Sequence, residues 1–118
     1  MQTVGTSKPD GLIVGDFPLE AVEVQVQGPA EFRRGDVVGL VDNQNLVLAD
    51  SSLKNGGQNP VGIMCRDVNP AQGETAVTTM YVKGAFNLRN LRFGGSDTFE
   101  NHKRRMTEIG LIVRETRV

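Results

Sequence analysis

One histidine, His102, and one cysteine, Cys65, are the residues with which this chain of 118 amino acids could build a Ser/His/Asp or Cys/His nucleophile or a zinc site. Nucleophilic catalysis of these types needs an imidazole close to the attacking group, and zinc needs several nitrogen, sulfur or carboxylate ligands. His102 falls on the apolar stripe of an expected helix and Cys65 inside an expected strand, which is typical of buried packing residues. A zinc site would need carboxylates or a second subunit to complete it. The sequence therefore favours a protein with no catalytic residue, no metal and no cofactor.

The glycines do not have the spacing of a phosphate-binding loop. Gly5, Gly11 and Gly15 lack the GxGxxG pattern and do not separate a strand from a helix. Gly56-Gly57 is not followed by Gly-Lys-Ser/Thr. The tripeptide Arg34-Gly35-Asp36 matches a short cell-adhesion motif, but it lies where a turn between strands is required, so we expect a turn.

Short strands joined by turns are expected to position most of these residues. Glycine is frequent, with 14 residues, tryptophan is absent and valine dominates the apolar set. Strict alternation of Val22, Val24 and Val26 with polar residues predicts a strand over 21–27. Further strands are expected at 37–41 and 46–48, which form a hairpin, and at 61–65, 76–82 and 111–113.

One helix is expected, over residues 97–110. Asp97 and Glu100 form a capping-box-like pair at its start, and Gly110 suits its end. The predicted fold class is mainly β, or β-rich α+β: a compact small β-barrel or β-tulip-like domain with one short helix near the C-terminus and an extended N-terminal arm. The apolar stripe of the helix consists of Phe99, His102, Met106 and Ile109.

The expected domain organisation is an arm over residues 1–16 and a single β-rich domain over 17–118. The arm contains three glycines, a proline and one short apolar run, which cannot build a core. That run, Leu12-Ile13-Val14, is too short to fold alone but could add as a strand to an exposed sheet edge elsewhere. A frayed terminus is the alternative interpretation of the arm.

The charge balance argues against two classes of partner. The chain has thirteen Lys and Arg residues and fourteen Asp and Glu residues, which gives a net charge of −1. This balance disfavours a protein that binds nucleic acid by neutralising its phosphates and a protein that binds membranes through a polybasic surface. No apolar run is long enough to cross a bilayer, and the N-terminus does not resemble a secretion signal, so we expect a soluble protein. A single cysteine allows no disulfide within the chain. The charge is uneven, with six basic and ten acidic residues up to Ala85 and seven and four after it, which weakly favours head-to-tail assembly.

Five short motifs occur in a fixed order between Phe32 and Val113. None of them is specific alone, since each has few fixed positions, but an ordered set at compatible spacing is hard to obtain by chance. In chain order the motifs are Arg34-Gly35-Asp36-Val37-Val38-Gly39, Pro60-Val61-Gly62-Ile63-Met64, Tyr81-Val82-Lys83-Gly84-Ala85-Phe86-Asn87, the 97–110 helix, and Gly110-Leu111-Ile112-Val113.

With these motifs in this order, the chain resembles the head decoration proteins of lambda-type bacteriophages. The resemblance implies a structural cement protein that binds as homotrimers at local threefold sites of the expanded phage head and stabilises the shell against internal DNA pressure. Its partners would be the major capsid protein and copies of itself, with no direct contact to nucleic acid or membrane. Its place would be the outer surface of the virion, after synthesis in the cytoplasm of the bacterial host.

The resemblance also implies a role for the arm, which in this family lies against the major capsid protein and extends its sheet. A second hypothesis, of a different class, is a small oligomeric β-domain that binds a small ligand at a subunit interface. Its nearest candidate residues are Asp67, Tyr81, Lys83 and His102, whose spacing does not bring them together. The arm residues expected to contact the capsid are Thr3, Val4, Leu12, Ile13 and Val14.

Overall fold

The computed structural model describes residues 11–15, 17–42 and 45–115. These residues form six strands, two short 3-10 helices and one α-helix. The mainly β class with one short helix near the C-terminus is confirmed. In chain order the elements are β1 (Glu20–Gln27), β2 (Val37–Val41), β3 (Asn45–Leu48), β4 (Pro60–Met64), β5 (Thr75–Asn87), η1 (Leu88–Asn90), η2 (Phe99–Asn101), α1 (Lys103–Glu108) and β6 (Leu111–Arg114).

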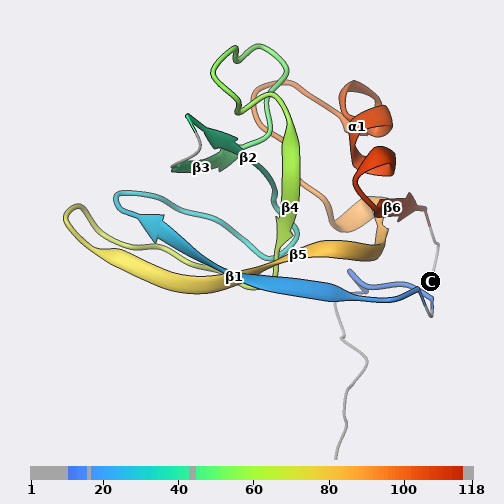
Figure 1. Cartoon of the computed structure of the whole chain (residues 1–118), viewed down its shortest axis with the longest axis horizontal. Helices are drawn as coiled ribbons and strands as arrows, with labels where there is room; N and C mark the ends of the chain where they lie inside the picture. Colours follow the sequence, from blue (N-terminus) through green and yellow to red (C-terminus); the bar gives the residue numbers. More distant parts are fainter. Residues whose placement is uncertain (1–10, 16, 43–44, 116–118) are drawn as a thin grey trace, which may run out of the picture.

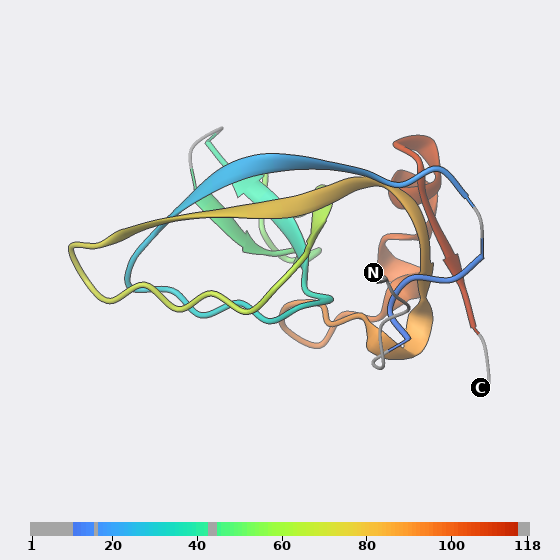
Figure 2. The ribbon, with the colours of Figure 1, turned by 90° about the horizontal axis from the view of Figure 1, so that it is seen from below.

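The strands form one sheet in the order β1-β5-β4-β2-β3, antiparallel throughout, and β6 pairs with β5 in parallel (Figure 1). Strands β1 and β5 run side by side as a long curved ribbon in both views (Figures 1 and 2). Strands β1 and β3 end the order and share no ladder, so the sheet formed by the described strands stays open between them. The predicted hairpin is confirmed as β2 and β3, with Val38 opposite Leu48.

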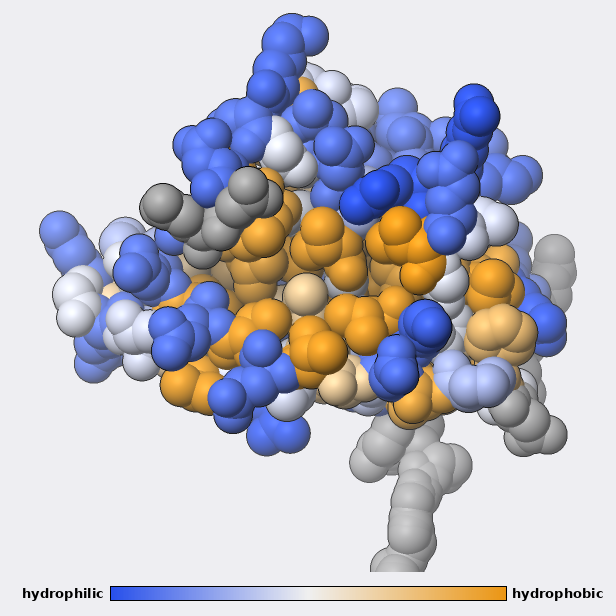
Figure 3. Space-filling model, in the orientation of Figure 1, coloured by the Kyte–Doolittle hydropathy of each residue, from blue (hydrophilic) through white to orange (hydrophobic). Residues whose placement is uncertain are grey.

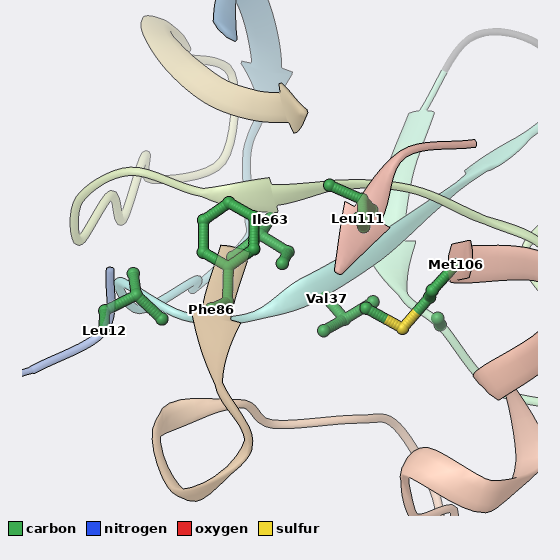
Figure 4. Packing of buried hydrophobic residues seen from close by; sticks show 7 residues of the cluster. Leu12, Val37, Ile63, Phe86, Met106 and Leu111 are labelled. Atoms are coloured by element: carbon green, nitrogen blue, oxygen red, sulfur yellow. The ribbon is translucent and has the colours of Figure 1, made fainter. Parts of the chain in front are cut away.

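Two apolar clusters hold the fold together, and they are called the first and the second cluster below. The second cluster lies against the inner side of the β1–β5 ribbon and is formed by Val26, Phe32, Val38, Met64 and Met80. The register between β1 and β5 confirms the predicted alternation, because Val22 and Val24 lie opposite Met80 and Thr78 and so share the face of Met80. Seven residues with no exposed surface make up the first cluster (Figure 4): Leu12, Val37, Ala49, Ile63, Phe86, Met106 and Leu111.

The C-terminal helix is shorter than predicted, because a 3-10 turn, η2, precedes the α-helical residues Lys103–Glu108. The predicted capping pair of Asp97 and Glu100 is wrong. The Asn101 side chain accepts a hydrogen bond from the Thr98 backbone N–H at 2.8 Å, whereas the Asp97 carboxylate bonds to Ser51, in the loop after β3, and to His102. The predicted stripe is confirmed: His102 and Met106 are buried, and Phe99 and Ile109 are partly buried against the first cluster.

Candidate protein-interaction surface

The predicted capsid-binding residues Leu12, Ile13 and Val14 pair with the chain's own sheet. Ile13 forms an antiparallel bridge with Phe86, beside the end of β5 (Figure 2). The Val14 N–H donates to the Ala85 carbonyl at 3.0 Å, and the Asn87 N–H donates to the Leu12 carbonyl at 2.8 Å. The expectation that these three residues extend the sheet of another protein is therefore corrected. Thr3 and Val4 lie outside the described residues.

The second half of β5 explains why this segment folds back. From Gly84 to Asn87 the strand pairs with β6 on one side, which leaves its other edge open for a further strand. Residues 12–14 form hydrogen bonds with the backbone groups of that edge, and the whole Leu12 side chain is buried in the first cluster. Residues 12–14 therefore belong to the folded domain, although the predicted arm included them.

The β1–β5 ribbon carries the exposed apolar surface of the molecule. Figure 3 shows apolar side chains gathered in a band across one face. The second cluster supplies partly buried residues along the ribbon, among them Val24 and Val82. Contiguous apolar surface of this kind marks sites of protein contact in soluble proteins. Among the described residues, the exposed large apolar side chains all lie on the ribbon or on the segment leading into it: Phe17 (46%), Leu19 (46%), Val22 (42%) and Val77 (60%). Val77 lies on the opposite face of the ribbon from Val22, because its partner is Gln25 whereas the partner of Val22 is Met80.

His102 is buried and takes part in a relay of polar side chains that reaches the surface at Ser51. Its Nε2 lies 2.6 Å from the Asp97 carboxylate, and its ring stacks on Phe93 with centroids 5.2 Å apart. The Ser51 hydroxyl donates to the same carboxylate at 2.8 Å. Asp97 thus stands between the serine and the histidine, whereas a nucleophilic triad needs the histidine between serine and aspartate. The relay fastens the loop after β3 to the helical segment.

The environment of Asp97 favours its ionised form. Burial acts in the opposite direction and is the largest single influence on this carboxyl. The hydrogen bonds from the Ser51 side chain and backbone, together with the hydrogen bond and electrostatic attraction of His102, outweigh it. The pKa of Asp97 is therefore lowered from its ordinary value.

Asp36 of the adhesion-like tripeptide is buried and fully engaged. Arg92 donates from its Nε and its second guanidinium nitrogen to the two carboxylate oxygens at 2.8 and 2.7 Å, and the Arg33 N–H donates at 2.8 Å. The Asp36 side chain is only 1% exposed. The tripeptide forms the turn before β2, as predicted, and its aspartate is not presented to an adhesion receptor.

The candidate ligand-binding residues are brought together only in part. Arg34 donates from its backbone N–H to Asp67 at 2.9 Å and from its side chain to the Tyr81 hydroxyl at 3.2 Å. His102 instead bonds to Asp97, and Lys83 lies two positions after Tyr81 on β5. Cys65 is partly buried directly after β4, and it is a free thiol.

Within the part of the chain that the structure describes, no group of three or more His, Cys, Asp or Glu side chains is placed to hold a metal ion. A search of the same residues finds no helix long and apolar enough to cross a membrane. Comparison with known protein families and with curated proteins finds no match for this chain.

Proposed function

We propose that this protein is a structural capsid decoration protein. It binds as homotrimers at local threefold sites of an expanded phage head, on the outer surface of the virion, and it stabilises the shell against internal DNA pressure. Its partners are the major capsid protein and other copies of itself. Catalysis plays no part in this role.

One observation carries the proposal. Each of the five motifs behind the resemblance contributes one residue to the first core cluster, and these residues contact one another although they come from distant parts of the chain (Figure 4). The motifs therefore supply five of the seven buried residues of this cluster, which supports a resemblance in architecture. In motif order the residues are Val37, Ile63, Phe86, Met106 and Leu111.

The apolar band on the β1–β5 ribbon supports assembly. A trimer could cover part of this band, and it would present three copies of each capsid contact to one threefold site. Linked contacts of this kind strengthen attachment by factors on the order of 10² to 10⁴ over a single contact. A cement protein can therefore use weak individual contacts.

Co-sedimentation with expanded, undecorated shells of a lambda-type phage tests the proposal. The full chain should bind saturably to expanded shells, and unexpanded shells serve as the control. A chain lacking residues 1–10 retains every described residue and tests the contribution of that segment, which includes Thr3 and Val4, so it should bind more weakly while keeping the same circular dichroism spectrum. A full chain that stays in the supernatant with expanded shells would contradict the proposal.

A further inference from the structure

We propose that the outer edge of β1, which pairs with no other described residue, accepts an extended strand from a partner polypeptide over the stretch from Ala21 to Gln25. This site is distinct from the N-terminal residues. It does not rest on the proposed capsid role, because its evidence is the sheet edge itself.

The ladder between β1 and β5 fixes which backbone groups point to the open side. The Gly28 N–H donates to the Glu74 carbonyl at 2.8 Å. Gly28 and Glu74 continue the β1–β5 register by one position, so they form a hydrogen-bonded pair of this ladder. Hydrogen-bonded and non-bonded pairs alternate along an antiparallel ladder. The backbone groups of Val22 and Val24 therefore point to β5, and those of Glu23 and Gln25 point away from the sheet.

The Cys65 N–H gives an independent check of this alternation. It donates to the Thr79 carbonyl at 3.2 Å, so Thr79 points to the β4 side of β5. Thr79 is the partner of Glu23 in the ladder, and their mutual pair is therefore the non-bonded kind. No described residue pairs with the outward groups of Glu23 and Gln25.

The free part of this edge has little of the usual protection. Natural sheets block open edges with charged side chains, above all lysine, and with proline, bulges or short strands. Strand β1 is eight residues long and contains no proline, lysine or arginine, its irregularity is confined to Glu20/Ala21 at its start, and Glu23 is the one charged residue between Ala21 and Gln25. At the other end of β1, Val26 and Gln27 lie across a groove of about 300 Å³ from Asn45–Val47 of β3. The residues from Ala21 to Gln25 are exposed or partly buried.

The side chains on this stretch define the chemistry of the partner. Val22 and Val24 lie on one face, next to the apolar band, so the added strand needs apolar residues on that face. Glu23 lies on the other face, exposed, and its cross-strand neighbour Thr79 is uncharged. A basic residue in the added strand would neutralise this carboxylate. The partner segment therefore carries apolar residues on one face and a basic residue beside Glu23 on the other, and it binds by strand addition.

Hydrogen exchange measured by NMR on the full chain tests the site, with a synthetic peptide of alternating valine and lysine as the probe. In the free protein the amides of Val22 and Val24 should exchange slowly and those of Glu23 and Gln25 fast. Bound peptide should slow exchange at Glu23 and Gln25 by roughly tenfold or more. Absence of binding at millimolar peptide, or binding that leaves these two amides fast, would overturn the proposal.

Two variants separate strand addition from charge attraction. Gln25→Pro removes an outward N–H without removing a bond to β5, so it should abolish peptide binding, whereas the matched control Gln25→Ala should bind normally. Glu23→Lys alters only an exposed side chain and should weaken binding of the basic peptide about tenfold or more. Equal binding by Glu23→Lys and the unaltered chain would overturn the assigned partner chemistry. If, without peptide, the amides of Glu23 and Gln25 exchange more slowly as the protein concentration increases, the strand added to β1 comes from a second copy of this chain, and the assigned partner is overturned.

Discussion

Leu12 is the residue whose role differs most from its sequence context. Its neighbours predict an arm, yet its side chain has no exposed surface and packs in the first cluster. Leu12→Ala should lower the free energy of unfolding by about 2–5 kcal/mol, because it leaves a cavity in that cluster. Urea denaturation measures this loss. The control Val77→Ala, at a side chain 60% exposed, should change it by no more than about 0.5 kcal/mol. Equal effects of the two variants would show that Leu12 is not part of the core.

Asp97 should give the protein an acid-sensitive contribution to stability. Its pKa is lowered in the folded state, so its stabilising effect is complete above the unfolded pKa and is lost as the pH falls through the folded pKa. Asp97→Asn should cost about 1–3 kcal/mol near neutral pH, because it weakens the bonds to Ser51 and His102. Denaturation at pH 7 and below pH 4 measures this cost. The gap between variant and unaltered chain should shrink in acid, and a gap that widens there would contradict the argument.

At the scale of elements, the turn before β2 depends on one glycine. Gly35 has φ +97°, and a Cβ atom there would overlap the Asn90 carbonyl oxygen. Gly73 has φ +85° with nothing within 4 Å of an added Cβ, so it isolates the cost of the backbone conformation. Gly73→Ala should cost roughly 1–2 kcal/mol, from the left-handed conformation alone. Gly35→Ala should cost more than about 3 kcal/mol, because backbone atoms must also move. Thermal unfolding of both variants tests this, and similar losses would contradict it.

The elements that were predicted from sequence are those with a local signal. The alternation of Val22, Val24 and Val26 located β1, and turn residues located the hairpin of β2 and β3. The missed features depend on residues far apart in the chain. Residues 12–14 pair with the second half of β5, and β5 continues to Asn87, beyond its predicted end, because Gly84–Asn87 pair with β6. An apolar run between two glycines was the only local sign of it.

The candidate site was predictable in the same uneven way. The sequence placed His102 on a buried stripe, but not its contact with Asp97, which was assigned to the helix cap instead. The Asp36–Arg92 ion pair joins residues 56 positions apart, and no spacing rule signals such a pair. Whether the apolar side chains of β1 stay exposed as a band depends on how much of each face of β1 the rest of the molecule covers. Alternation identifies the two faces of a strand, but not how much of each face is covered.

At the scale of the whole molecule, two truncations distinguish a binding arm from a structural segment. Removing residues 1–10 leaves every described contact in place, and if these residues act as a binding arm the free energy of unfolding should stay within about 0.5 kcal/mol of the full chain. Removing residues 1–16 also deletes Leu12 and the strand beside β5, and it should cost at least the about 2–5 kcal/mol expected for Leu12→Ala. Urea denaturation compares the two. Because the longer truncation damages the domain, its failure to coat shells would carry no information about the arm. Equal stability of both truncated chains would show that residues 11–16 belong to the arm after all.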